Sequence, residues 1–421
     1  MESAATRRAT LLVAFMWGAY FLNYCDRQVV SALFSVLKTE LKFTDEQLGL
    51  TGAYFLWVYG ACCPLAGILG DKVSKRLLVV LSLALWSLIT IVTGFSAGPT
   101  MLLGLRAAMG VSEALYMPSA IALTTSAFPV SRRSRVIAGL TTAQVAGTVA
   151  GSSFGGWMGD LGIWRWAFFG LGAAGLLYAV PYLLFLRGVH EAAPGAPASS
   201  PPGAKFTLRT LIKIPSYMLL CVVFPVFVFG LWLIYSWLPN FFEEKFILSR
   251  TSAALNATVF LQGSTLIGIL GGGVLADWLY RRTPAARFWL LVASLVFCAP
   301  CLHALGHCAS LNATRVAAAA FGLFSGLLMG NIFPAAFEVV PAEARASAVG
   351  VLNFCGSILS GLGPYFGGAW KKSLGIDGLL TRTGFAYAAA GLVLIIGTRM
   401  LLPRDYALIR SSHAPNPDRG M

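Results

Sequence analysis

Long apolar segments recur along almost the whole chain, and short polar stretches separate them. Each segment reaches or exceeds the roughly 20 apolar residues that a helix needs to cross a bilayer. Helices satisfy their own backbone hydrogen bonds, which hydrocarbon requires. The pattern therefore predicts about twelve transmembrane helices, several of them long enough to be tilted or to protrude. The predicted spans are residues 9–36, 47–69, 77–97, 101–128, 135–158, 165–187, 215–241, 251–279, 287–308, 312–340, 345–370 and 380–402.

Pro, Ser, Gly and Ala dominate residues 190–205, which lack the apolar periodicity of the segments on either side. This composition is typical of a flexible linker. Six predicted spans precede the linker and six follow it. We therefore expect an N-terminal six-helix bundle at 1–188, a cytoplasmic linker at 189–212, a C-terminal six-helix bundle at 213–403 and a cytoplasmic tail at 404–421.

The two halves of the chain echo each other. Residues 67–76 (GILGDKVSKR) end the second span, and residues 273–282 (GVLADWLYRR) end the eighth. Residues 116–140 similarly resemble residues 331–351. Two repeats in one membrane are typical of transporters that bind a substrate between the repeats, near the membrane midplane. The sequence thus predicts an all-α membrane protein of two pseudo-symmetric six-helix bundles.

Composition and charge support a membrane protein. The chain is 57% hydrophobic and only 11% charged, whereas soluble domains carry roughly 25% charged residues. A net charge of +14 could indicate a nucleic-acid partner. However, with both termini in the cytoplasm, about 20 of the basic residues fall in cytoplasmic segments and about 9 outside, as the positive-inside rule requires. We therefore expect a lipid bilayer and no nucleic acid as partner, in a multi-pass protein of a bacterial inner (plasma) membrane.

Four charged residues lie within the first and fourth predicted spans: Asp26, Arg27, Arg106 and Glu113. Each is costly in a bilayer core, at least roughly 2.5 kcal/mol for Asp or Arg, so we expect them to face the protein interior and to pair. Their charges sum to zero. An organic anion would add one unmatched negative charge, and a proton on Glu113 or Asp26 would cancel it, so each ligand would favour the other. The alternative is a static salt-bridge network that only holds the bundle together.

Aromatic and amide side chains are candidates for lining the same chamber, because aromatic faces suit sugar rings and amides suit hydroxyl groups. For a single Tyr or Trp the alternative is membrane-interface anchoring or core packing. The candidates are Tyr24, Tyr59, Trp237, Asn240, Gln262 and Asn353.

The loop after the second span carries a family resemblance. Gly67, Gly70, Asp71, Lys72, Lys75 and Arg76 resemble the loop motif of the major facilitator superfamily, and Gly273, Asp277, Arg281 and Arg282 form a weaker second copy. In that family these loops act as a charge latch on the cytoplasmic face. The resemblance implies a gating latch of Asp71, Arg76, Asp277, Arg281 and Glu338, with Glu338 joining through Arg281 or Arg345. The alternative is loop charge that merely obeys the positive-inside rule.

The run Asn23-Tyr24-Cys25-Asp26-Arg27-Gln28, together with Arg106, Glu113-Ala114 and Pro118, resembles the anion:cation symporter family. It is also similar to the spinster-type lipid transporters. In the symporters the matching carboxylates are linked to protons, while the matching Arg and a span-5 Gln hold the substrate. The resemblance therefore implies proton coupling at Asp26 and Glu113, tuned by Arg106, and substrate contacts at Arg27, Gln144 and Asn353. Ser112 departs from the Gly that is common before the Glu.

Other functional classes find little support. The run from Cys298 to Cys308 contains Cys and His at spacings that superficially suit a metal, but small packing residues at a helix end explain it better. No Ser/His/Asp set or phosphate-binding loop stands out, so we expect no enzyme activity and no cofactor. We predict a monomeric secondary transporter that couples protons to symport of a small organic anion, such as a sugar acid. The alternatives are a spinster-like lysolipid transporter and a proton-coupled sugar or amino-sugar transporter.

Overall fold

The computed structural model describes residues 2–117, 119–120, 123, 128, 130–189, 211–341 and 344–406. Within them lie twelve helices of 16 residues or more, one for each predicted span. Nine of these described helices are long and apolar enough to cross a membrane. The first six are α1 (Glu2–Gln28), α3 (Asp45–Lys72), α4 (Lys75–Gly94), α5 (Pro99–Ala114), α7 (Val130–Asp160) and α8 (Arg165–Arg187). The second six are α10 (Pro215–Phe246), α11 (Arg250–Tyr280), α12 (Ala286–His307), α13 (Leu311–Val339), α14 (Arg345–Ala369) and α15 (Lys371–Met400).

The first predicted span, 9–36, is wrong at its end. Helix α1 stops at Gln28, and a short 3-10 helix, η1 (Ser31–Leu33), leads into α2 (Phe34–Glu40). Val29 and Leu33 in this turn are fully buried. Because the turn is as apolar as the helix before it, hydropathy alone could not mark where the helix ends.

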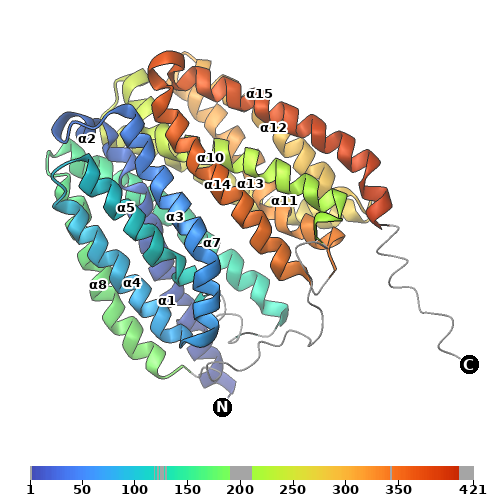
Figure 1. Ribbon diagram of the computed structural model, residues 1–421, viewed down its shortest axis with the longest axis horizontal. Coiled ribbons are helices and arrows are strands. Elements are labelled where there is room, and N and C mark those ends of the chain that lie inside the picture. The colour runs from blue at the N-terminus through green and yellow to red at the C-terminus, as the bar shows by residue number, and fades with distance from the viewer. Residues whose placement is uncertain are drawn as a thin grey trace, which may run out of the picture.

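The helices form two bundles, which Figure 1 shows side by side in blue to green and in yellow-green to red. Within the first bundle α1 packs on α7, α3 on α5 and α4 on α8, and within the second α11 packs on α13, α10 on α14 and α12 on α15. Between the bundles the most extensive contacts join α3 to α14 and α7 to α11. The expected all-α architecture of two helical bundles is confirmed. The proposed domain boundaries stay a prediction, and residues 190–210 of the linker lie outside the described residues.

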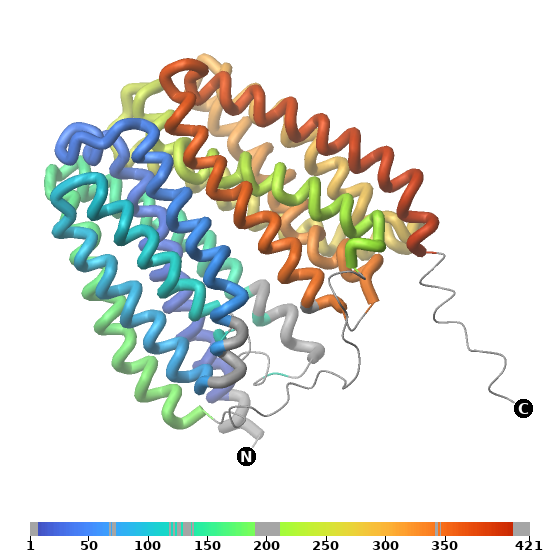
Figure 2. The backbone as a smooth tube through the Cα atoms, viewed as in Figure 1, coloured from blue at the N-terminus to red at the C-terminus, as the bar shows by residue number. Residues whose placement is uncertain are grey.

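Glycines let the two bundles touch backbone to backbone at one end of the molecule. A Cβ on Gly49 would lie 2.3 Å from the Pro364 carbonyl oxygen, and one on Gly368 would lie 2.0 Å from the Asp45 carbonyl oxygen. Small residues permit this close approach of helices. We call this region, marked by Asp45 and Gly368, the closed end. Toward the opposite end, where α15 ends, the tubes of α3 and α14 diverge (Figure 2).

Candidate functional site

A buried ion pair joins the end of α1 to the end of α5. Arg27 Nε donates to Glu113 Oε2 at 2.6 Å, and the two side chains are 7% and 0% exposed. The other carboxylate oxygen, Glu113 Oε1, has no hydrogen-bond partner among the described residues. The pair confirms that these two intramembrane charges face the interior and meet. It also shows that Arg27, which the sequence analysis predicts to bind the substrate, is paired with Glu113 in this structure.

Three aromatic rings surround the Arg27 guanidinium. Its central carbon lies 4.9 Å from the ring centroids of Tyr24 and Phe55 and 5.0 Å from that of Tyr59. Such contacts stabilise a desolvated cation by about 2 kcal/mol or more. Tyr24 and Tyr59 were sequence candidates, whereas Phe55 was not. Phe55 lies one helical turn before Tyr59, so the i, i+4 spacing could have placed both rings on one face.

The other two intramembrane charges, Asp26 and Arg106, are buried but form no ion pair within the described part of the chain. Arg106 Nε donates to the Thr51 carbonyl at 3.1 Å, and its guanidinium lies 4.9 Å from the Phe55 ring. Asp26 Oδ1 has no hydrogen-bond partner there. The expectation that all four charges pair is therefore met only by Arg27 and Glu113. Phe55 nonetheless touches both guanidinium groups, so the four charges lie in one neighbourhood.

Two candidates from the second bundle have structural partners instead. Trp237 is fully buried, and its Nε1 donates to the Pro364 carbonyl at 2.9 Å. Asn240 Oδ1 accepts a hydrogen bond of 2.6 Å from Lys371 Nζ. Pro364 also contacts Gly49 at the closed end. These contacts hold the second bundle and the closed end together, and they occupy the Trp237 indole N–H and the Asn240 amide oxygen.

The remaining candidates differ in their surroundings. Gln144 is half-buried on α7, and Asn353 is exposed on α14. Gln262 is buried on α11 and lines a small cavity between the bundles, together with Gln28 and Tyr235. Gln262 is thus the second-bundle candidate that the structure places at a cavity.

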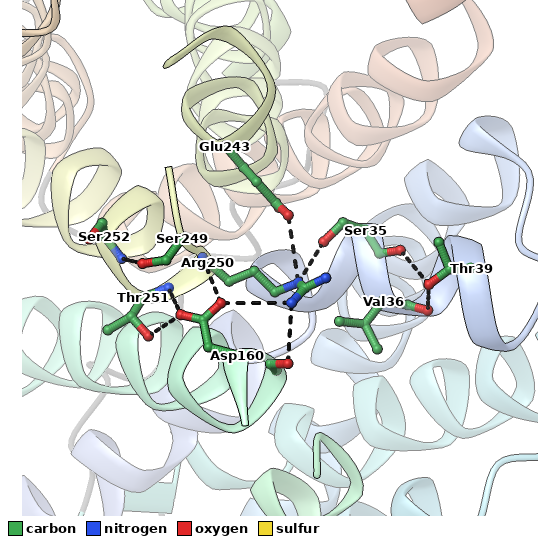
Figure 3. Close-up of polar contacts among 10 residues, drawn as sticks. Ser35, Val36, Thr39, Asp160, Glu243, Ser249, Arg250, Thr251 and Ser252 are labelled. Atoms are coloured by element: carbon green, nitrogen blue, oxygen red, sulfur yellow. Dashed lines mark hydrogen bonds and ion pairs between the residues drawn. The ribbon is translucent and has the colours of Figure 1, made fainter. Parts of the chain in front are cut away.

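A polar cluster across the closed end was missed by sequence reasoning. The Asp160 carboxylate at the end of α7 accepts from the backbone N–H groups of Arg250 and Thr251, both at 2.9 Å, and from Thr251 Oγ1 at 2.6 Å. Arg250 Nε donates to Ser35 Oγ at 3.0 Å and lies 3.6 Å from Glu243 Oε1. Figure 3 shows Asp160 reaching the first turn of α11 while Arg250 extends toward Ser35. We call these five residues the closed-end lock.

In the lock, Asp160 of the first bundle caps the N-terminus of α11 in the second bundle. Its carboxylate accepts hydrogen bonds from N–H groups that have no partner within α11, and its negative charge is favourable at the positive end of that helix. In the sequence, Asp160 and Arg250 read as ordinary loop charges 90 residues apart. Only the fold brings them together, so no local signal could have revealed them.

The Asp160 carboxylate stays charged at neutral pH. Partial burial acts to raise its pKa, but hydrogen bonds from Thr251 and Arg250, with the Arg250 charge, lower the pKa below the ordinary value of 3.8. A lowered pKa means that the contribution of Asp160 is fully present above the ordinary pKa and is lost as pH falls through the folded value. Asp160 is therefore suited to locking and not to proton exchange near neutral pH.

We expect Asp160→Asn to weaken the closed end without destroying the fold, because the amide keeps one acceptor but loses the charge. The measurement is labelling of an introduced Val36→Cys, a position buried at the closed end, by a membrane-impermeant maleimide. Labelling should be about two- to fivefold faster, the range for a partly exposed charge contact. Lys372→Gln removes an exposed charge from α15 and serves as the control. Equal labelling rates in the Asp160 variant and the parent would contradict the role of the lock.

The second copy of the loop motif forms a cluster within the second bundle. Arg287 Nη2 lies 2.9 Å from Asp277 Oδ1, and Arg287 Nη1 also bonds Glu338, whose other oxygen accepts from Tyr406 Oη at 3.1 Å. Glu338 therefore pairs with Arg287 and not with Arg281 or Arg345, because Arg287 lies in the first turn of α12 and reaches both carboxylates. Arg345 instead donates to the Phe337 carbonyl. Burial raises the pKa of Tyr406 above its ordinary value, so this phenol is a neutral donor to Glu338.

The first copy is described only in part. The Asp71 side chain lies outside the described residues. Arg76 Nη1 donates to the Val189 carbonyl at 2.9 Å, which ties the start of α4 to the chain just after α8. The latch role of Asp71 and Arg76 stays a prediction.

Two bundles of membrane-spanning helices, the first of which buries an ion pair and two further charges, define a multi-pass membrane transport protein. The model of the Major Facilitator Superfamily matches residues 16–364, and the chain belongs to that family. Because the family consists of transporters, this protein is a transporter and not an enzyme.

Similar proteins include two whose names state an organic anion as cargo. The chain is 30% identical over 328 residues to the "Probable sulfoacetate transporter SauU" of Cupriavidus necator, over 69% of this chain and 71% of that protein. It is 24% identical to the "Hexuronate transporter" of Bacillus subtilis, over 84% of this chain and 86% of that protein. It is 29% identical to "Protein spinster homolog 1" of Rattus norvegicus, over 73% of this chain but only 62% of that protein.

A solved structure has the same fold. A bacterial homologue of the human lysosomal transporter spinster, in an inward-facing and unoccupied conformation, aligns with a TM-score of 0.79 at 20% identity. The alignment covers 97% of this chain and 99% of that one. At this identity the likeness establishes the fold alone.

Proposed function

We propose that this transporter carries a small organic anion, a carboxylate or sulfonate, together with protons by alternating access. The observation that carries the proposal is the ion pair of Arg27 and Glu113, in which the counter-ion of a buried guanidinium is itself a group that can be protonated. Relatives named for sulfoacetate and hexuronate support an organic anion as cargo.

The ion pair suggests how protons and anion are coupled. While Glu113 is ionised it neutralises Arg27, and a substrate anion would have to displace it. Once Glu113 binds a proton, Arg27 becomes an unpaired cation in surroundings of low dielectric constant. Binding of an anion next to it is then strongly favoured. Proton and anion together leave the net charge of the site unchanged, so each promotes binding of the other.

The remaining charges have supporting roles in this proposal. Asp26, which has no ion-pair partner in the described residues, is the second proton carrier, and Arg106 tunes the electrostatics of Glu113 across Phe55. Tyr24 and Tyr59, whose rings lie against the Arg27 guanidinium, would line the substrate site beside it. Gln144, Gln262 and Asn353 are proposed contacts for the rest of the substrate.

Alternating access requires the closed end to open and the opposite end to close. We propose that the closed end faces the outside of a bacterial inner membrane and that both termini are cytoplasmic, with one chain as the working unit. The closed-end lock would then release during transport, while the loop motifs that contain Asp71 and Asp277 would stabilise one of the two gating states.

Uptake by purified protein in proteoliposomes tests the proposal. Radiolabelled sulfoacetate and glucuronate are each offered with an inward proton gradient, with no gradient, and with a protonophore. We expect accumulation above equilibrium for at least one anion with the gradient, and none after the protonophore. Accumulation that ignores the proton gradient would contradict the coupling, and no uptake of either anion would contradict the substrate class.

Because the chain is similar to a spinster homologue, a lysolipid is a second candidate substrate. Its anionic headgroup would use the same guanidinium. Excess lysolipid that blocks uptake, where excess sugar acid does not, would favour this candidate. A neutral sugar is less compatible with two buried guanidinium groups, Arg27 and Arg106.

A further inference from the structure

A small cavity lies where the two bundles meet, next to the candidate site. Its volume is about 10 Å³, which is room for one water-sized group. Both bundles contribute to its wall. Gln28 of α1 and Thr148 of α7 line it from the first bundle, and Tyr235 of α10 and Gln262 of α11 line it from the second.

Three polar atoms around this cavity lack hydrogen-bond partners within the described residues. They are Thr148 Oγ1, Tyr235 Oη and Gln262 Nε2, on side chains of residues that are 2%, 8% and 1% exposed. An unpaired buried polar group costs about 1–3 kcal/mol, and such groups are rare in folded proteins. Three such atoms line one cavity and come from both bundles, so a single polar group bound there could pair with them.

A third hydroxyl at the cavity shows the contrast. Thr258 of α11 also lines it, but its Oγ1 donates to the Ala254 carbonyl of its own helix at 2.7 Å. That hydroxyl is already satisfied, so lining the cavity does not by itself leave a group unpaired.

The cavity adjoins the Arg27 environment. Gln28 directly follows Arg27 in the chain. On the other side, a Cβ on Gly147, the residue directly before Thr148, would lie 2.9 Å from the Tyr24 Cβ, and the Tyr24 ring centroid lies 4.9 Å from the central carbon of the Arg27 guanidinium. A ligand whose anionic group binds Arg27 can therefore extend its far end past Tyr24 toward the cavity.

The chemistry of the three unpaired groups matches a hydroxyl. The phenol of Tyr235 and the hydroxyl of Thr148 can each donate or accept, and the amide nitrogen of Gln262 donates. A hydroxyl is also both donor and acceptor, and it fits the available volume. A site built for a hydroxyl discriminates strongly against analogues that lack one, because its polar groups are then left unpaired.

We propose that Thr148, Tyr235 and Gln262 form a hydroxyl subsite that makes this transporter prefer hydroxylated organic acids over short acids without hydroxyl groups. The inference rests on the proposed anion transport. It adds a specificity for the part of the substrate remote from Arg27, contributed by both bundles and completed only when they meet.

The test compares Gln262→Leu with the parent protein in proteoliposomes under a proton gradient. D-glucuronate is the hydroxylated probe and sulfoacetate the probe without hydroxyl groups. We expect the ratio of KM for glucuronate to KM for sulfoacetate to rise about tenfold, as for one lost hydrogen bond. Tyr235→Phe, which removes only the hydroxyl, should shift the ratio in the same direction. Thr258→Val is the matched control and should change the ratio by less than about twofold.

The outcomes separate the subsite from the transport function. An unchanged ratio in both Gln262→Leu and Tyr235→Phe overturns the subsite, as does a Thr258→Val shift as large as theirs. Parent protein that transports sulfoacetate but not glucuronate also overturns the subsite, while anion transport stands. Parent protein that transports neither anion overturns the proposed function, and the subsite falls with it.

Discussion

Glu113→Gln is expected to abolish proton-driven accumulation of the anion while exchange of anion across the membrane continues. Glutamine is nearly isosteric with protonated glutamic acid and cannot ionise. The variant would therefore hold Arg27 permanently free for the anion, and binding would no longer depend on a proton. Coupling disappears because no charge change at this position remains to be linked to transport.

The measurement pairs two assays on the same proteoliposomes. One is uptake driven by a proton gradient, and the other is counterflow from liposomes preloaded with the unlabelled anion. Glu244→Gln is a suitable control, because Glu244 is a half-exposed partner of Lys371 on α10 and should accumulate anion as the parent does. Undiminished accumulation by Glu113→Gln would remove Glu113 from the coupling mechanism.

Arg27→Lys is expected to reduce anion uptake by about 100-fold, although the positive charge is kept. Lysine cannot present a planar fork to a carboxylate or sulfonate, and it fits less well between the rings of Tyr24, Phe55 and Tyr59. Lysine is preferred to alanine here, because removing the cation would leave Glu113 as a buried unpaired charge and threaten folding.

Initial uptake rates over a range of anion concentrations provide the measurement, with monodispersity and thermal stability in detergent as checks of folding. The loss should appear mainly in KM if Arg27 binds the anion. Arg165→Lys, which alters an arginine that bonds the Gly94 and Ser96 carbonyls away from the site, should retain uptake. A folded Arg27→Lys variant with parental KM would show that Arg27 is not the anion site.

Much of the fold and part of the site could be predicted from the sequence, for clear physical reasons. Apolar spans are constrained by bilayer thickness, so their number and order can be read from hydropathy. Charges within spans are costly, so Arg27 and Glu113 could be expected to meet. The same rule failed for Asp26 and Arg106, because a backbone carbonyl and an aromatic ring can accommodate a guanidinium without a carboxylate.

What the sequence could not supply were contacts between segments far apart in the chain. Phe55 is one apolar residue among many, and only the packing of α1, α3 and α5 places its ring between two guanidinium groups. Asn240 could not be distinguished from a substrate contact, because its partner Lys371 lies 131 residues away. Thr148 and Tyr235 likewise could not be predicted to line one cavity, because they lie in different bundles and only the packing of the bundles brings them together.

The cap that Asp160 places on α11 ties the local order of one helix to the position of the other bundle. The first amides of α11, at Arg250 and Thr251, are satisfied by the Asp160 carboxylate, which the proposed opening of the closed end would withdraw. Under the proposed alternating access, their hydrogen exchange with deuterated solvent would be slow while Asp160 is in place and fast after it departs, and would report which way the transporter faces. The conformation of an unlabelled protein could then be followed by mass spectrometry, from the deuterium uptake of the peptide that contains Arg250 and Thr251.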